Sequence, residues 1–557
     1  RRGYFAVFIM GFATLAAQTV LIREFFVTFN GNELTIGIVL GAWILMEAAG
    51  SLIGGYVVRK TKNAAASYAF IQFAVFIFFP AVIYLIRAMK ALLGFGVGES
   101  VGNLFILSSS LAVILPLGIP MGMLFPLACA MARRASGETA ESIGAVYFTE
   151  ALGFMAAGPV ITYILITKFN SFSIAFLMSG LMAASLALIL ARKEAAGGPR
   201  VLFGISALLA LSAILSATAP SSYLNTASLG LQWRGQKLLH YENSIHGNLA
   251  AAGRLGQYTF YSNGMPIISS PDPDIWHTED LVHFAMASHP DPKTVLLIGG
   301  GAGGVVNEVL KYPVEKLIYA ELDPQLIRLI ESFPTELTKK ELSDRRLEIK
   351  YIDGALLARK MASFGEKVDV VMLNLPIPST LQLNRFYTKE FYDALRRILP
   401  EDGILVFTLP GSPSAMSPEM TDLNGVILKT LKIAFKTFVV PGYSNVYLAS
   451  PQKFVEAPPA LLLERMGERG VTAKLFNRQY AEDRMGEQWV KWFGDSISRY
   501  KGGRINSDLV PVGTYYAVSY LNSMLSPETI KLTRVLAGIN LPILLLAILA
   551  AGFLAII

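Results

Sequence analysis

The chain has almost no cysteine and little charge. Its 557 residues include one cysteine, Cys129, so neither a disulfide within the chain nor a cysteine-based metal site can form. Charged residues make up 16% of the chain and hydrophobic residues 53%, whereas a soluble globular protein carries about 25% charged residues. The net charge of +7 fits Lys and Arg residues that flank membrane spans better than binding of nucleic acid.

Apolar runs that could each cross a lipid bilayer, about 20 residues long, recur through the first 218 residues and return once near the end. We therefore expect a multi-pass α-helical membrane bundle that carries a water-soluble insert between its last two spans. Because the chain opens on Arg1 and stops on apolar residues, we also expect further residues at one or both ends. The predicted spans are 4–28, 34–58, 65–88, 103–131, 141–167, 171–191, 201–218 and 534–557.

The charges of the loops predict an orientation in the cell (inner) membrane. Positive residues concentrate on the cytoplasmic side of a membrane protein, and after seven spans the insert then faces outward. A miscounted or missing span would reverse this side. The N-terminus and the even-numbered loops carry ten Lys or Arg residues, namely Arg1, Arg2, Arg59, Lys60, Lys62, Arg133, Arg134, Arg192, Lys193 and Arg200. The odd-numbered loops carry three, namely Arg87, Lys90 and Lys168.

Ionisable residues within predicted spans are candidates for function, because a charge in the bilayer is costly and usually faces the interior of a bundle. Glu47 and Glu150 lie deepest, and we expect these two membrane-embedded acids to mark a pathway or a pair. Arg23, Glu24 and Glu33 lie nearer the ends of their spans. For these three, neutralisation of neighbours at the membrane interface is an equally good interpretation.

The insert contains a glycine cluster that follows an apolar run. Val295–Ile298 leads into Gly299, Gly300, Gly301, Gly303 and Gly304, and a second apolar run ends in Glu321, 17 residues past the last glycine. Glycines let the backbone approach a ligand, and an acid at the end of the next strand accepts hydrogen bonds from ribose hydroxyls. The pattern predicts a nucleoside-binding Rossmann-like domain.

Alternating segments predict the rest of the insert as an α/β domain preceded by a small N-terminal β unit. Asn263-Gly264 is a strong hairpin signal. The predicted strands of the α/β part are 295–298, 317–321, 348–352, 368–373 and 403–408. The predicted domains are a bundle of about seven helices (1–218), a β unit with a lead-in helix (219–290), a Rossmann-like core (291–455), a C-terminal strap (456–530) and a transmembrane helix (531–557).

Several motifs occur in an order that resembles a known family, the spermidine synthases or polyamine aminopropyltransferases. The likeness is to the bacterial variety that is fused to a transmembrane bundle, and it covers about 240–450. The matching residues are Gly264, Trp276-His277, Gly299–Gly304, Glu308, Glu321, Asp353-Gly354 and Phe386–Tyr392.

The resemblance implies a substrate and two binding residues. The substrate is decarboxylated S-adenosylmethionine or a related adenosyl nucleoside, and the acceptor is a small amine or polyamine. Glu321 would hold the ribose hydroxyls, and Asp353, followed by Gly354, would accept from the adenine amino group. The less favoured alternatives are that Glu321 caps a helix or is solvated and that Asp353-Gly354 forms an ordinary turn. A homodimer is a possible assembly.

The chain also departs from the pattern of this family. Ala302 stands where the glycine loop of the family has an acid, and Asn374 stands where the family has its catalytic carboxylate. Thr278 and Thr408 replace a glutamate and a glutamine. Aminopropyl transfer needs a neutral amine as nucleophile, so a base must take a proton. Asn374 can accept a hydrogen bond but cannot act as a useful base.

Nearby residues could replace the lost base. Glu279 and Asp280 are the first candidates, and Asp272 and Asp274 are further ones, although acids at the start of a helix often only stabilise that helix. His277 or His283 is a third choice, since imidazole titrates near neutrality. These two histidines are six residues apart, so they do not share a helix face as metal ligands would, and we expect no metal site.

Three functions remain open from the sequence. The first is a membrane-anchored aminopropyltransferase with altered catalytic residues. The second is a catalytically degenerate nucleoside- or other ligand-binding module, such as a sensor, that is coupled to the bundle. The third is a transporter in which the bundle, with Glu47 and Glu150, moves a substrate that the insert binds.

Overall fold

The computed structural model describes residues 2–31, 33–136, 139–190, 199–452 and 456–525, together with residues 542, 545–547 and 549–550. The chain divides into two compact units. The first comprises Arg1–Ser100 and Phe105–Ile267, and the second comprises Val101–Leu104 and Ile268–Ile557. The predicted last span, 534–557, and the predicted helical domain 531–557 lie mostly outside the described residues.

The first unit is mainly a helical bundle. Among its described residues, six helices are long and apolar enough to cross a membrane, or seven if α8 and α9, which meet at a bend of 56°, form one span. They form the predicted α-helical bundle and are candidates for its membrane spans. Their bounds are α1 (Arg2–Phe29), α2 (Glu33–Lys60), α3 (Ala64–Leu92), α4 (Asn103–Ser136), α5 (Thr139–Val160), η1 (Ile161–Leu165), α6 (Ile166–Lys168), α7 (Ser171–Leu190), α8 (Pro199–Ser216) and α9 (Ala219–Gln232).

Glycines bring helix backbones together at both acids that the sequence placed deep in the spans. A Cβ atom on Gly11 of α1 would lie 2.3 Å from the carbonyl oxygen of Glu150 in α5, and one on Gly122 of α4 would lie 2.1 Å from the carbonyl oxygen of Glu47 in α2. Any larger residue would force the helices apart, which is the usual reason for small residues at membrane helix contacts. Glu47 and Glu150 are half-buried, and their proposed role in a pathway stays a prediction.

A small antiparallel sheet follows the bundle in sequence, with strand order β1-β2-β3-β4. Asn263 and Gly264 join its last two strands with φ angles of 49° and 80°, and two positive φ values are what a tight hairpin turn requires. The predicted hairpin is therefore confirmed. The strands are β1 (Leu238–Asn243), β2 (Asn248–Arg254), β3 (Gln257–Ser262) and β4 (Met265–Ser270).

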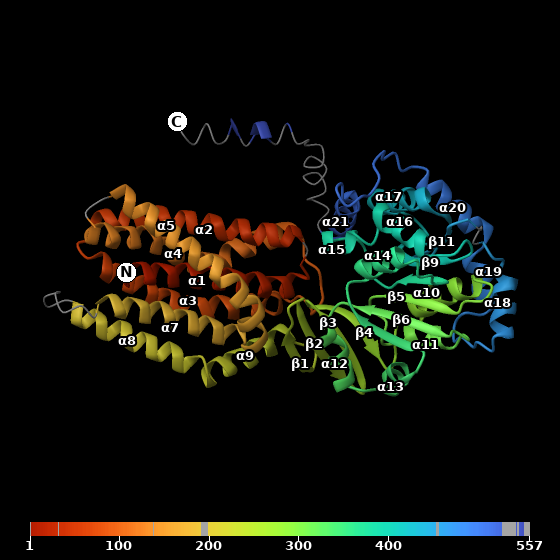
Figure 1. Cartoon of the computed structure of the whole chain (residues 1–557), viewed down its shortest axis with the longest axis horizontal. Coiled ribbons are helices and arrows are strands. Elements are labelled where there is room, and N and C mark those ends of the chain that lie inside the picture. Colours follow the sequence, from red (N-terminus) through yellow and green to blue (C-terminus); the bar gives the residue numbers. More distant parts are fainter. Residues whose placement is uncertain are drawn as a thin grey trace. The chain divides into compact units, whose positions relative to one another are not determined.

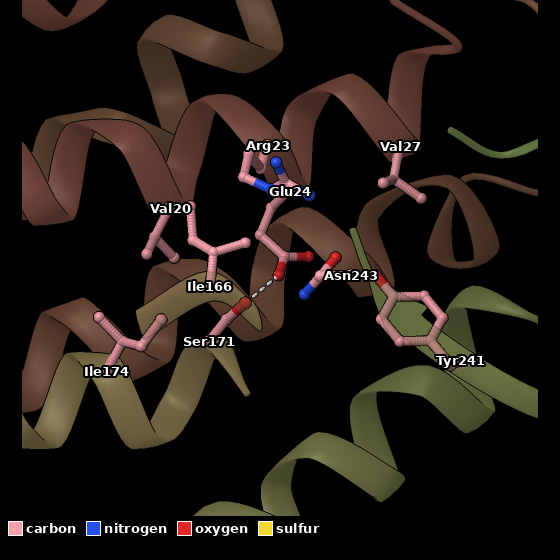
Figure 2. A pocket seen from close by; sticks show the side chains of 9 residues that line it. All are labelled: Val20, Arg23, Glu24, Val27, Ile166, Ser171, Ile174, Tyr241 and Asn243. Carbon is pink, nitrogen blue, oxygen red and sulfur yellow. Dashed lines mark hydrogen bonds between the residues drawn. The ribbon is translucent and has the colours of Figure 1, made fainter. Parts of the chain in front are cut away.

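A buried ion pair joins two helices of the first unit. Arg87 of α3 donates two hydrogen bonds of 2.7 Å to the carboxylate of Glu24 in α1, and Ser171 donates a third, of 2.5 Å. Figure 2 shows Glu24 and Ser171 facing each other beside a cavity that also borders Tyr241 of β1. The cavity holds about 10 Å³, which is room for about one water molecule. The first unit thus contains a buried ion pair, and the Glu24 carboxylate receives its hydrogen bonds from side chains of the same unit.

Arg23, the neighbour of Glu24, links α1 to the small sheet. Its guanidinium donates to the carbonyl oxygens of Ser244, at 3.0 Å, and Gly247, at 2.9 Å. Both acceptors lie in the turn between β1 and β2. The bundle and the first strands therefore form one unit because polar groups at the end of α1 find their partners in the sheet.

We expect Arg87→Met to destabilise the full-length protein strongly. The substitution leaves the Glu24 carboxylate buried without its cation, and breaking a buried pair in this way costs about 3–5 kcal/mol. Thermal unfolding in detergent should show a lower midpoint. In the double variant Glu24→Gln/Arg87→Met no charge remains to be buried, so most of the loss should be recovered. A double variant as unstable as the single one would mean that packing, not charge, causes the loss.

The second unit alternates strands and helices. Its described elements are α10 (Ile275–Ser288), β5 (Thr294–Ile298), α11 (Val305–Leu310), β6 (Lys316–Glu321), α12 (Pro324–Ser332), α13 (Glu336–Ser343), β7 (Leu347–Tyr351), α14 (Gly354–Phe364), β8 (Val370–Leu373), α15 (Leu381–Asn384), α16 (Lys389–Ile398), β9 (Ile404–Pro410), α17 (Pro418–Ala434), β10 (Lys436–Val440), β11 (Ser444–Ser450), α18 (Pro459–Glu468), α19 (Arg478–Arg484), α20 (Glu487–Ile497) and α21 (Val512–Leu525).

These strands form one seven-stranded sheet in the order β10-β11-β9-β8-β5-β6-β7. Strands β5 to β9 run parallel, and β10 and β11 are antiparallel additions at one edge. Helices α14, α16 and α17 form one layer, and α10 and α11 belong to the other (Figure 1). All five predicted strands are confirmed, and the unit has the expected Rossmann-like α/β fold.

The apolar strands explain why helices cover both faces. Leu296 and Ile298 of β5 are buried in the same cluster as Ala355 of α14 and Phe391 of α16, while the intervening Leu297, also fully buried, points to the other face. A strand with no polar face must be covered on both sides. The chain moves outward from β5 through β7 and then returns to β8, so the strand order reverses between β5 and β8. In such sheets ligands bind at the carboxyl ends of the strands at this reversal.

Candidate active site

The glycine loop follows β5 at the point where the strand order reverses. Gly299, Gly300, Gly303 and Gly304 all have positive φ angles, between 48° and 127°, so side chains other than glycine would be strained there. A Cβ atom on Gly303 would also lie 2.5 Å from the side chain of Ile268. The predicted loop is therefore present, and its path depends on glycine. Ala302 within it is buried.

A glutamate that the sequence did not single out holds this loop. The carboxylate of Glu341 in α13 accepts hydrogen bonds from the backbone N–H groups of Gly303 at 2.7 Å, Gly304 at 2.7 Å and Asn307 at 2.9 Å. The side chain is fully buried, and burial raises its pKa although these three donors oppose the change. Glu341 lies in an ordinary polar helix, so no local signal in the sequence could have identified it.

Glu321 lies where the sequence predicted it, at the carboxyl end of β6 beside the glycine loop. Tyr319 donates a hydrogen bond of 2.6 Å to one carboxylate oxygen, and the backbone N–H of Asp323 donates one of 3.1 Å to the other. Burial raises the pKa of Glu321, against the effect of these donors. A carboxylate held in this way keeps lone pairs for further donors such as ribose hydroxyls, so the predicted role stays open.

Asp353 and Gly354 lie at the carboxyl end of β7, and Asp353 begins α14. One oxygen of Asp353 accepts from the backbone N–H of Leu356 at 2.8 Å, and the other pairs with Arg385 at 2.5 Å. A Cβ atom on Gly354 would lie 2.3 Å from the side chain of Ile298, so this position needs glycine for packing. Asp353 is thus a helix cap with an ion pair, and binding of an adenine amino group would share a carboxylate that is already in use.

Asn374 follows β8 and connects the two sides of the reversal. Its amide nitrogen donates to the carbonyl oxygen of Gly300 at 2.7 Å, and its amide oxygen lies 2.8 Å from Nε2 of His277. His277 belongs to the first turn of α10. One chain of hydrogen bonds therefore joins three predicted site residues: Gly300 of the glycine loop, Asn374 and His277.

This chain of hydrogen bonds fixes the proton of neutral His277. The carbonyl of Gly300 can only accept, so the amide nitrogen of Asn374 must face it. The amide oxygen then faces His277 and can only accept, so Nε2 must carry the proton and Nδ1 keeps a lone pair. In the described part of the chain, Nδ1 has no hydrogen-bond partner. An aspartate at position 374 would instead place an oxygen against the Gly300 carbonyl.

The predicted bases Glu279 and Asp280 point to other partners. The carboxylate of Glu279 accepts three backbone N–H groups, from Lys474, Leu475 and Phe476, at 2.7–2.8 Å. Asp280 forms an ion pair with Arg484 and accepts a hydrogen bond of 2.8 Å from Tyr480. Burial raises the pKa of Asp280, against the effect of Arg484. Both acids therefore anchor the segment 474–484 to α10, which favours a structural role.

His283, the other candidate base, lies in a buried group with Glu279 and Glu308 whose ligand atoms are all within 4.8 Å of one another, close enough to hold a metal ion. Each member already has a partner within the chain. His283 contacts Tyr312 at 2.9 Å and Glu308 at 3.2 Å, and Lys311 lies 2.6 Å from Glu308. The Lys311 ammonium lies where it neutralises the cluster, so the geometry of the cluster favours an ion-pair network.

The remaining candidate acids lie at the start of α10. Asp274 caps α10 through the N–H of His277, and Asp272 is exposed.

The predicted strap also contacts the core. Asn506, fully buried, donates to the carbonyl oxygen of Tyr387 at 2.9 Å, and its own carbonyl accepts from the N–H of Lys389 at 2.9 Å. Thr388 donates to Asp508 at 2.8 Å. The segment after the core thus holds the Phe386–Tyr392 motif at the start of α16.

Comparisons with known proteins identify a family model and several relatives for this part of the chain. A family model described as the spermine/spermidine synthase domain matches residues 275–451. A polyamine aminopropyltransferase of Pyrobaculum aerophilum is 33% identical over 221 residues, which cover 38% of this chain and 75% of that protein. One of Oceanobacillus iheyensis is 28% identical over 303 residues, or 53% of this chain and 57% of the relative. A crystal structure of spermidine synthase with the transition state analogue AdoDATO matches with a TM-score of 0.40 and 24% identity. The match covers 47% of this chain and 88% of the chain in that structure.

The fold and the site define a Rossmann-like domain of the kind that binds a nucleoside at the reversal of its strand order. The identity to the Pyrobaculum protein and its coverage go further. The chain belongs to the polyamine aminopropyltransferase family, and its second unit carries the spermidine synthase-like domain.

The ion pairs of Glu308 predict a stability that depends on pH. Burial alone would raise the pKa of Glu308, but hydrogen bonds from His283 and Lys311 outweigh it and lower the pKa below the usual 4.5. A lowered pKa gives stability that is present above the usual value and is lost as the pH falls through the folded value.

We therefore expect Glu308→Gln to cost about 1.5–3 kcal/mol near neutral pH and progressively less in acid. Denaturation midpoints of both proteins, measured from about pH 7 to about pH 3, should converge at the low end. A difference that stays constant would show that the charge of Glu308 does not contribute. Glu315→Gln is a matched control, since Glu315 is exposed and should show no such dependence.

Proposed function

We propose that this protein transfers the aminopropyl group of decarboxylated S-adenosylmethionine to an amine, with His277 as the group that takes the proton. The observation that supports this most is the chain of hydrogen bonds from Gly300 through Asn374 to His277, which leaves Nδ1 with a lone pair. It lies at the reversal of the strand order, where Glu321 and the glycine loop flank it. The relatives named as polyamine aminopropyltransferases support the same reaction.

The chemistry requires one base and no redox partner. The amine nitrogen attacks the methylene carbon that is bonded to the sulfonium, a C–N bond forms and the C–S bond breaks. The electron pair of the C–S bond stays with the sulfur atom, so the leaving group is methylthioadenosine, a neutral thioether. The amine gives up one proton to Nδ1 of His277, and the hydrogen bond from Nε2 to Asn374 orients the ring throughout.

We propose that the residues at the carboxyl ends of β5, β6 and β7 hold the nucleoside. Glu321 accepts the ribose hydroxyls, and the glycine loop lets the ligand approach the backbone. Asp353 and Gly354 border the adenine. For the membrane part, we propose a cell-membrane protein whose second unit faces away from the side that carries most loop Lys and Arg residues.

A second candidate function is nucleoside binding without turnover. The observation in its favour is that Asn374 is neutral and both of its amide atoms are already engaged. Binding and turnover must therefore be measured separately.

For binding, we expect methylthioadenosine to bind the full-length protein in detergent with micromolar affinity. Glu321→Ala should weaken it at least about tenfold, since loss of a charged hydrogen-bond acceptor costs about 1.5–3 kcal/mol. Calorimetric titration measures this. Glu331→Ala, at an exposed position on α12, is the matched control and should bind like the wild type. Equal affinity of the Glu321 variant would remove this residue from the nucleoside site.

For turnover, we expect release of methylthioadenosine from decarboxylated S-adenosylmethionine in the presence of an amine. His277→Ala should lower kcat by about 10²–10⁴-fold, the usual contribution of a general base. His246→Ala is the control, because that side chain is exposed and belongs to the first unit. Full activity of His277→Ala would refute the proposed base. Binding with no product for any amine would favour the second candidate function.

A further inference from the structure

Tyr319 is a buried polar residue beside the site to which the proposed reaction gives no role. It lies on β6 two residues before Glu321, so the two side chains point to the same face of the sheet. Its side chain is fully buried, although a tyrosine hydroxyl can both donate and accept hydrogen bonds and needs partners for them. The partners of this hydroxyl therefore indicate what the residue does.

The hydroxyl of Tyr319 connects the glycine loop to Glu321. The backbone N–H groups of Gly301 and Ala302 donate to its oxygen, and its own hydrogen goes to a carboxylate oxygen of Glu321 at 2.6 Å. Burial, and then the charge of Glu321, hold the pKa of Tyr319 well above its usual value, so the hydroxyl keeps the proton that it donates. Hydrogen bonds in such a chain strengthen one another.

The glycine loop leaves room for the ring of Tyr319. The other glycines of the loop have positive φ angles, but Gly301 does not, so a left-handed backbone is not the reason for glycine at this position. A Cβ atom on Gly301 would lie 3.0 Å from the ring of Tyr319 and 2.8 Å from the side chain of Leu297. The missing side chain at 301 thus lets the phenol ring pack directly against the loop.

Glu321 is also held by the chain that follows β6. The backbone N–H of Asp323 donates to the second carboxylate oxygen at 3.1 Å. Donors on both oxygens fix the plane of the carboxylate, whose last side-chain bond has only a weak rotational preference of its own. The two neighbouring hydroxyls of a ribose need acceptors in a set orientation, and such an orientation has to be maintained by hydrogen bonds from behind.

We infer that Tyr319 orients the Glu321 carboxylate toward the two hydroxyls of a ribose, and that the preference of the site for ribose over dideoxyribose depends on it. This inference rests on the proposed function, because it concerns the nucleoside half of that site. Since Tyr319 is fully buried, it acts on the ribose only through Glu321 and is a positioning residue.

The test compares methylthioadenosine with its 2′,3′-dideoxy analogue, which lacks the two hydroxyls that Glu321 would bind. Calorimetric titration measures both affinities for the full-length protein in detergent. The wild type should bind methylthioadenosine at least about tenfold more tightly than the analogue. In Tyr319→Phe this ratio should fall about fivefold or more, because methylthioadenosine binds more weakly while the analogue binds as it does to the wild type.

Two results with Tyr319→Phe would overturn the inference and leave the proposed function intact. An equal loss of affinity for both ligands would mean that the residue only maintains the fold, and an unchanged ratio would mean that Glu321 does not need it. The variant removes one oxygen atom and keeps the ring that packs against Gly301, and its thermal midpoint checks that it is folded. A wild type that does not bind methylthioadenosine would instead refute the nucleoside site of the proposed function, and the inference with it.

Tyr447→Phe is the matched control. Tyr447 is also fully buried and also donates a hydrogen bond of 2.6 Å, to Asn424, but three strands separate its strand β11 from β6. This variant should keep the ratio of the wild type.

A double-mutant cycle with Glu321→Ala tests whether Tyr319 acts through Glu321. In the Glu321→Ala background, Tyr319→Phe should change the ratio less than about twofold, because the carboxylate that it would orient is gone. The full effect of Tyr319→Phe in that background would overturn the inference.

Discussion

The site depends on one buried carboxylate, that of Glu341, which holds the glycine loop from behind. It accepts hydrogen bonds from three backbone N–H groups at the start of α11, and these bonds fix the path of the loop. With its far end held, the loop presents the carbonyl of Gly300 to Asn374. Asn374 in turn orients His277. The position of a reactive imidazole thus follows from a contact made on the opposite side of the loop, which is how preorganised sites are usually supported.

Most of the fold could be predicted from the sequence because its signals are local. The apolar strands, the hairpin at Asn263-Gly264 and the long apolar helices each carry their own pattern within a few residues. The glycine loop and Glu321 could be placed for the same reason. These features need only the period of a strand or a helix and the conformational freedom of glycine.

The remaining parts of the site come from contacts between distant segments. Glu279 and Asp280 were predicted as candidate bases. Their hydrogen-bond partners could not be foreseen, because these lie 195 to 204 residues further on, in a segment with no motif of its own. No pattern in the sequence marks Glu341 or Arg484, which lie on the short polar helices α13 and α19. A sequence shows which groups can ionise, but it does not show which of them are already paired in the folded chain, and that pairing decides what remains for a substrate.

The contact of Arg23 with the small sheet has a consequence for biosynthesis. The carbonyl of Ser244 lies 221 residues after Arg23 in the chain, so α1, which is long and apolar enough to cross a membrane, is made long before this acceptor exists. An α1 that enters a bilayer at that stage has to keep the guanidinium hydrated at the bilayer surface, which favours a position that leaves the end of the helix in the headgroup region. In a membrane-inserted chain the order of synthesis would thus restrict how deeply the first helix can insert.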